Sequence, residues 1–302
     1  MVRPVKNNGG DKPQESDDRL ERPDSGQVGN AREKVRETLK TPGRLMRGLR
    51  LWKRMQVKGE IETEGMENLD LIPPGKKVIF APTHITDGDI PAAALALGDH
   101  FKLGIVNQSV HHRLTGEPSM YLGLLLAGKG NFYPVDFEWV KRKGKKSKVG
   151  RFNPQNYLAM SKAMDEEGKA MVMAAHSPAF NSKLPGKGGF GVVFLAGLTD
   201  AVVVPVAVDF QSEHTITAET YLQNIVHRSG VKIRIGKPID FEPIEGIEDS
   251  LELFSQEKGL LSADERAESR RILKTLTRQS NQLMRELASL LPPDKRGVWS
   301  EA

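Results

Sequence analysis

The chain contains no cysteine among its 302 residues. This absence excludes disulfide bonds, thiolate nucleophiles and cysteine-based metal sites. No apolar run reaches the roughly 18–20 residues that a membrane-spanning helix requires. The opening stretch MVRPVKNNGGDKPQESDD lacks the apolar segment of a secretion signal. We therefore expect a cytoplasmic protein that is soluble or bound peripherally to a surface.

Large apolar residues are also scarce in residues 1–30, which are rich in Gly, Pro, Asn, Asp and Ser. Such a segment buries too little surface to offset the entropy of ordering, so we expect a disordered tail. The whole chain carries a formal net charge of +5. A basic protein favours anionic partners such as lipid headgroups, nucleic acid or phosphorylated substrates, although simple solubility explains this charge equally well.

Residues 31–58 form the second predicted region, a basic helical segment with a break at 41–43. Apolar residues recur at helical spacing in RLMRGLRLWKRMQ, and arginine and lysine fill most other positions. A basic amphipathic helix that contains a tryptophan can lie on an anionic membrane surface. The alternative is a helix that packs its apolar stripe on the following domain and turns its arginines to water.

From residue 59 onward, strand and helix patterns alternate. This order predicts one α/β domain with a mostly parallel, mixed sheet flanked by helices. We place the catalytic domain at 59–245 and a C-terminal helical extension at 246–302, where Ser262–Glu265 has the sequence of a capping box. The predicted strands are 59–64, 77–82, 101–107, 131–135, 170–175, 202–208 and 231–236, and the predicted helices are 89–98, 117–127, 154–167, 189–198 and 262–290.

The stretch 137–151 is dense in lysine and arginine and includes two glycines. Mutual repulsion argues against a regular element, so we expect a surface loop that is either simply solvated or binds phosphate groups. Interleaved aromatic residues that would stack on bases are missing, which disfavours a nucleic-acid partner.

Histidine and aspartate cluster where a predicted strand meets a predicted helix, in the stretch PTHITDGDIPAA. A histidine is the usual general base for a hydroxyl group, and an aspartate can fix its orientation. His84 and Asp89 therefore form a candidate catalytic pair. The alternative is structural, because Asp89 before Ile90 and Pro91 suits a helix cap, and Asp87 with Gly88 suits a turn.

This stretch, His84-Ile-Thr-Asp-Gly-Asp89, resembles the His-x-x-x-x-Asp motif of the glycerophospholipid acyltransferase family, which includes the lysophosphatidic acid and glycerol-3-phosphate acyltransferases. The resemblance extends over about 59–240 in consistent order. The segments that carry it are GEIETEGMENL at 59–69, KLGIVNQSV at 102–110, LLLAGKGNFYPVD at 124–136, LPGKGGFGVVFLAGLTDAVVVPVAV at 184–208 and VKIRIGKPID at 231–240.

The resemblance implies the α/β fold of glycerolipid acyltransferases and an O-acyltransferase activity in phospholipid biosynthesis. In that family, the motif histidine deprotonates the acceptor hydroxyl and the aspartate orients the histidine. The acyl donor would be acyl-CoA or an acylated carrier protein, and the acceptor a glycerol phosphate or lysophospholipid. It implies no other cofactor and no covalent intermediate. His111 and His112 lack further ligands at suitable spacing, so we expect no metal site.

Two motifs depart from the family pattern. The arginine that normally follows the aliphatic–Asp pair of the second motif is replaced by Phe137, and Arg151 stands after the basic insertion. The Phe-Pro-Glu-Gly-Thr of the third motif is replaced by a sequence that starts with His176 and Ser177. Arg151, His176, Ser177 and Lys187 are the candidates for substrate contacts. The alternatives are a polar turn for His176 and a loop lysine for Lys187.

The altered third motif also motivates a rival interpretation, a catalytically inactive lipid-binding protein with the acyltransferase fold. A nucleic-acid-binding protein that uses 137–151 is a second rival from another class. Our expectation remains an enzyme that is peripheral on the inner face of the cytoplasmic membrane, with an anionic membrane surface as its partner.

Overall fold

The computed structural model describes residues 43–86, 88–108, 131–142, 145–151, 153–176, 185, 187–211, 229–255 and 261–300. All of these residues belong to one compact unit, 39–302. The predicted tail 1–30, the first part of the helical segment and the predicted helix 117–127 lie outside the described residues.

An eight-stranded sheet organises the unit, in the order β1-β8-β7-β2-β6-β3-β4-β5. Strand pairs are parallel except β7 with β8 and β4 with β5. The mostly parallel, mixed sheet predicted from the sequence is confirmed. The strands are β1 (Val57–Glu64), β2 (Lys77–Pro82), β3 (Leu103–Gln108), β4 (Phe132–Arg142), β5 (Lys145–Arg151), β6 (Ala170–Val172), β7 (Ala201–Phe210) and β8 (Ser229–Ile235).

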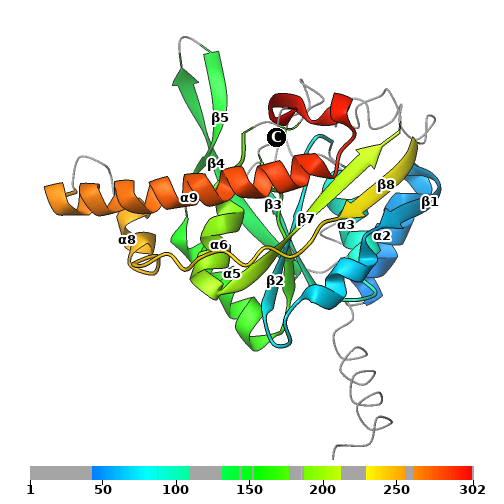
Figure 1. Ribbon diagram of the computed structural model, residues 1–302, viewed down its shortest axis with the longest axis horizontal. Coiled ribbons are helices and arrows are strands. Elements are labelled where there is room, and N and C mark those ends of the chain that lie inside the picture. The colour runs from blue at the N-terminus through cyan, green and yellow to red at the C-terminus, as the bar shows by residue number, and fades with distance from the viewer. Residues whose placement is uncertain are drawn as a thin grey trace, which may run out of the picture. The chain divides into compact units, whose positions relative to one another are not determined.

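Helices cover both faces of the sheet (Figure 1). Alternate side chains of β2 show why, since Val78 and Phe80 join one hydrophobic cluster while Ile79 and Ala81 join the other. A strand buried on both faces reads as a continuous apolar run, as KVIFAP does. One face carries α2 (Gly43–Gln56) and α3 (Asp89–Leu97), and the other carries α5 (Pro154–Glu166), α6 (Gly191–Thr199), α8 (Ser250–Ser255) and α9 (Ala263–Ser289).

The helix α2 turns its apolar stripe toward the domain. Leu45, Met46 and Leu49 are buried in the cluster that α3 also forms, and Trp52 packs against it. Arg44, Arg47, Arg50 and Arg54 are exposed on the other side of the helix. The packed helix is the alternative that the sequence pattern left open, and the apolar stripe is therefore occupied by the protein itself.

The basic stretch 137–151 is a β-hairpin, so the predicted loop is wrong. Strand β4 runs on to Arg142, and β5 pairs with it antiparallel from Arg142 opposite Lys145 to Asp136 opposite Arg151. Aromatic and β-branched residues at 137–140 favour a strand. The hairpin satisfies its own backbone hydrogen bonds, and this local pairing outweighs the charge repulsion that suggested a loop.

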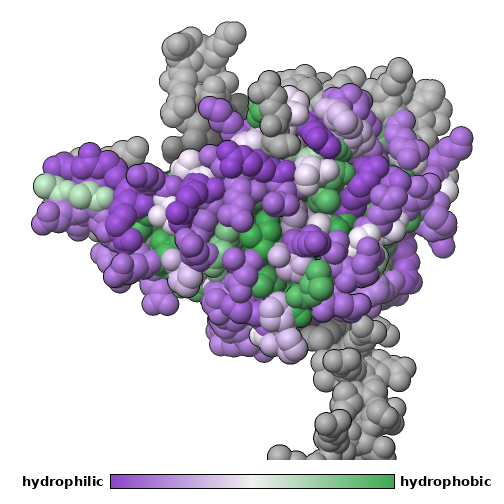
Figure 2. Space-filling view, in the orientation of Figure 1, coloured by the Kyte–Doolittle hydropathy of each residue, from purple (hydrophilic) through white to green (hydrophobic). Residues whose placement is uncertain are grey.

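The C-terminal helix α9 begins with the predicted capping box, in which the Ser262 hydroxyl and the Glu265 carboxylate each accept a backbone N–H from the other residue. Figure 2 shows hydrophilic residues covering its outer side. Its inner side buries Ile272, Leu276 and Leu283 in the core. Residues 246–302 thus contribute core side chains rather than a separate layer. Of the described helices, none is long and apolar enough to cross a membrane.

Candidate active site

The motif histidine lies just beyond the carboxyl end of β2, which has β7 on one side and β6 on the other. Ligands of open α/β sheets bind at this edge. His84 is partly buried there, in the turn between β2 and α3. Its neighbours on the chain, Thr83 and Thr86, are buried. The sequence therefore places the imidazole at the edge of the sheet where substrates are expected.

The turn is held by the Asp89 carboxylate, which is completely buried. One carboxylate oxygen accepts the Ile85 backbone N–H and the other accepts the Thr86 hydroxyl, each at 2.6 Å. The Thr86 hydroxyl in turn accepts the backbone N–H of Gly88 at 3.1 Å. Asp89 is the first residue of α3, with Gly88 as its N-cap. The carboxylate thus closes the turn that carries His84.

The imidazole of His84 is oriented by a backbone carbonyl. Its Nδ1 lies 3.3 Å from the Thr86 oxygen. A carbonyl only accepts hydrogen bonds, so this contact assigns the proton to Nδ1 and leaves Nε2 as the basic nitrogen. Asp89 is linked to the ring through Thr86, which donates its hydroxyl to the carboxylate and offers its carbonyl to Nδ1.

Burial favours the neutral forms of His84 and Asp89. The pKa of His84 falls to about 4, first because the ring is buried and second because His176 is close. Burial raises the pKa of the Asp89 carboxyl to about 7, against hydrogen bonds from Thr86, Ile85 and Thr83 that lower it. At neutral pH, His84 is an unprotonated imidazole, which is the form that a general base needs.

A second histidine lies against the first. The Nε2 atom of His176 accepts the backbone N–H of His84 at 3.0 Å. His176 is 3% exposed and follows β6, the neighbour of β2. It forms an antiparallel bridge with Gly188, so the adjacent Lys187, whose side chain is exposed, is near this part of the site. The structure therefore brings together His84, Asp89 and His176, and places Lys187 next to the residue that bridges His176.

The two remaining candidates are not described in side-chain detail. Ser177 lies outside the described residues, as do Asp87, His111 and His112. Arg151 ends β5, and the hairpin returns it opposite Asp136, which is the end of the second motif. Strands β6, β3 and β4 separate β5 from β2. Arg151 is thus aligned with the second motif but lies several strands away from His84.

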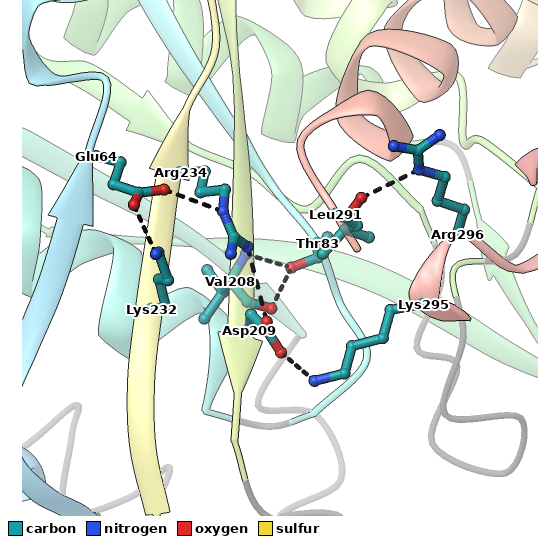
Figure 3. A network of polar contacts seen from close by, with 9 residues as sticks. All are labelled: Glu64, Thr83, Val208, Asp209, Lys232, Arg234, Leu291, Lys295 and Arg296. Carbon is teal, nitrogen blue, oxygen red and sulfur yellow. Dashed lines mark hydrogen bonds and ion pairs between the residues drawn. The ribbon is translucent and has the colours of Figure 1, made fainter. Parts of the chain in front are cut away.

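A polar network borders the site on the side of β7 (Figure 3). The Thr83 hydroxyl accepts the Val208 backbone N–H at 3.1 Å. The next residue, Asp209, is buried and accepts a hydrogen bond of 2.5 Å from Lys295, while Arg234 lies 3.7 Å from it. Sequence patterns did not single out Asp209, although an acidic residue that ends the apolar strand AVVVPVAV is a usable signal.

Two aromatic side chains, Phe210 and Trp52, lie beside the turn at Gly88. A Cβ atom on Gly88 would lie 2.6 Å from the Phe210 ring and 3.2 Å from the Trp52 ring. Trp52 comes from α2 and Phe210 from the end of β7. The glycine of the motif therefore lets two rings approach the backbone next to the candidate base.

Comparisons with known proteins give a remote structural likeness. No protein-family model and no curated protein sequence matches the chain. Among solved structures, the chain is similar to the 1-acyl-sn-glycerophosphate (LPA) acyltransferase PlsC from Thermotoga maritima, with 15% identity. The match covers 83% of this chain and 82% of that chain, with a TM-score of 0.38. A likeness at this level carries no functional argument.

No group of three or more His, Asp or Glu side chains that could hold a metal ion occurs within the described residues. The described residues at this edge supply an imidazole with a basic Nε2, a buried carboxyl that holds its turn, and a second histidine bonded to its backbone.

Proposed function

We propose that the protein is an O-acyltransferase that moves a fatty acyl group from acyl-CoA or acyl-carrier protein to a hydroxyl of a glycerol phosphate or lysophospholipid. The observation that carries this proposal is the state of His84. Its ring is neutral, its Nδ1 is directed to the Thr86 carbonyl, and the turn of the His-x-x-x-x-Asp spacing holds it at the carboxyl edge of the sheet. An unprotonated ring with an electron pair on Nε2 and a fixed orientation supports a role as a base toward a hydroxyl.

In the proposed reaction, the acceptor hydroxyl gives its proton to Nε2 of His84 as its oxygen attacks the thioester carbonyl carbon. The carbon–sulfur bond then breaks, and the leaving thiolate takes the proton back from the imidazolium. The Thr86 carbonyl holds the ring through Nδ1 during both proton transfers, and Asp89 holds Thr86. No protein nucleophile is required, which agrees with a sequence that lacks cysteine.

The decisive experiment measures transfer of a radiolabelled acyl group from acyl-CoA and from acyl-carrier protein into a panel of hydroxyl acceptors. His84→Ala should lower the rate by about 10²–10⁴-fold, since that is the usual contribution of a general base. His100→Ala is the matched control, because His100 is exposed at the far end of α3. Folded wild-type protein that binds lipid but transfers no acyl group to any acceptor would favour the inactive lipid-binding alternative.

The partner surface is proposed to be an anionic membrane, with the protein peripheral on its cytoplasmic side. The support is the exposed row of arginines on α2, whose apolar stripe is buried in the domain. Attachment through this helix is then electrostatic and should weaken as salt rises. Co-flotation with anionic vesicles at low and high salt tests it, and equal binding to zwitterionic vesicles would contradict it.

A further inference from the structure

His176 is a buried histidine to which the proposed reaction gives no role. It comes from the segment after β6, and its Nε2 accepts the backbone N–H of His84, a residue 92 positions earlier in the sequence. The two residues meet because β2 and β6 are parallel neighbours whose carboxyl ends lie together. A histidine side chain thus holds the main chain at the residue that carries the candidate base.

This hydrogen bond fixes the charge of His176. A backbone N–H can only donate, so Nε2 of His176 must be unprotonated, and the ring is neutral with its proton on Nδ1. Protonation of His176 would remove the acceptor and leave the N–H of His84 without this bond. The observed arrangement is therefore available only while His176 is uncharged.

We propose that His176 is a positioning residue that fixes the backbone of His84, and with it the imidazole of the candidate base, through a hydrogen bond that only an uncharged His176 ring can accept. The inference deepens the acyl transfer proposed above and rests on it for its functional meaning. It also gives a role to the altered third motif, in which a histidine stands where the family that the chain resembles has a different sequence.

The electrostatic surroundings agree with this role. Burial is the first cause of the lowered pKa of His84, and His176 lowers it further only when its own ring carries a proton, a state in which the hydrogen bond to His84 is lost. Among the described residues, the charged groups closest along the chain are Asp89, which holds the turn of His84, and Lys187, next to Gly188, which bridges His176. The Asp89 carboxylate accepts hydrogen bonds from Ile85 and Thr86. Lys187 is exposed, so water screens the charge of the lysine.

Nuclear magnetic resonance of the full chain labelled with ¹⁵N-histidine tests the proposal without any turnover. In the wild type, His176 should show the Nδ1–H tautomer and His84 should titrate near 4. In His176→Gln, the side-chain carbonyl can still accept the His84 N–H, so the amide chemical shift of His84 should stay close to the wild-type value, whereas His176→Leu should move it as the hydrogen bond is lost. The matched control His100→Gln should leave that shift unchanged. An unmoved His84 amide in His176→Leu, or an Nε2-protonated His176 in the wild type, would overturn the proposal.

Activity separates positioning from packing. In His176→Leu, which has no acceptor for the His84 N–H, we expect kcat to fall about tenfold or more. His176→Gln restores an acceptor and should recover most of that loss. Equal loss of kcat in both variants would mean that His176 only packs. If the wild type transfers no acyl group, acyl transfer is refuted, whereas the His84 amide shift still decides the role of His176.

Discussion

Asp89 and Thr86 are joined by a hydrogen bond of 2.6 Å between a fully buried carboxylate and a buried hydroxyl. Thr86 also offers its carbonyl to Nδ1 of His84. The motif aspartate is thus linked to the motif histidine through one intervening residue. Removal of the carboxylate should loosen the turn and the ring together.

We therefore expect Asp89→Ala to destabilise the protein by about 1–3 kcal/mol, because the Ile85 N–H loses its acceptor in a buried turn. Acyl transfer should fall by about 10²-fold as the base loses its position. The matched control is Asp99→Ala, since Asp99 forms an exposed ion pair with Arg50 and such pairs contribute about 1 kcal/mol or less. Urea unfolding and acyl-transfer rates measure both effects, and equal losses in the two variants would contradict this account.

The pH dependence of stability should reveal two opposing titrations. Asp89 has its pKa raised from 3.8 to about 7 on folding, so the stability it contributes is full at low pH and is lost as pH rises toward 7. His84 has its pKa lowered from 6.5 to about 4, so its contribution is full above 6.5 and is lost as pH falls toward 4. Between these limits, the two effects oppose each other in the wild type.

Variants should separate the contributions of the Asp89 and His84 titrations to stability. From pH 6.5 to pH 4.5, Asp89→Asn should lose more stability than the wild type, because only the His84 limb remains. Over the same interval, His84→Gln should gain stability relative to the wild type. Each difference should be on the order of a few kcal/mol, since one pKa unit corresponds to about 1.4 kcal/mol. Urea midpoints at the two pH values measure it, and parallel curves for all three proteins would refute the assignment.

Gly88→Ala tests the packing of Phe210 and Trp52 against the turn. The backbone of Gly88 is in the ordinary helical region, so alanine causes no backbone strain. Its Cβ would overlap the Phe210 ring, and we expect a loss of about 1–3 kcal/mol from overpacking. Phe210→Leu in the same chain should recover part of the loss. Gly43→Ala on α2 has no atom within 4 Å of its Cβ and should be close to neutral, so a similar loss there would point to a cause other than the clash.

The packing of α2 predicts unequal effects of two leucines on one helix. Leu45 is 1% exposed and Leu51 is 41% exposed. Leu45→Ala should cost about 2–5 kcal/mol, which is typical of a buried leucine, whereas Leu51→Ala should stay within about 0.5 kcal/mol. Thermal or urea unfolding compares them directly. Similar small losses would mean that the helix does not contribute to the domain core.

The sequence predicted those parts of the fold that depend on local signals. Continuous apolar runs such as KVIFAP identified the buried strands, and Ser262 with Glu265 identified the start of α9. The hairpin at 137–151 was missed because the charge of a segment says little about whether its backbone finds a partner. The orientation of α2 could not be chosen either, since a membrane and a domain bury the same stripe.

The sequence predicted which residues form the candidate site but not which hydrogen bonds join them. His84 and Asp89 were identified by type and spacing, yet spacing does not specify which atoms receive the carboxylate oxygens. The contact of His176 with the His84 backbone depends on the order of β2 and β6 in the sheet. Strand order is a property of the whole chain, and therefore no local pattern contains it.

The bond between Asp209 and Lys295 connects distant parts of the sequence at the edge of the sheet that carries His84. Asp209 adjoins the residue that pairs with Thr83, whereas Lys295 follows α9. During synthesis, the turn around His84 leaves the ribosome long before Lys295 does. This border of the site is therefore completed late, and proteolytic removal of the segment after α9 would remove the Lys295 contact from the edge of the sheet that carries His84.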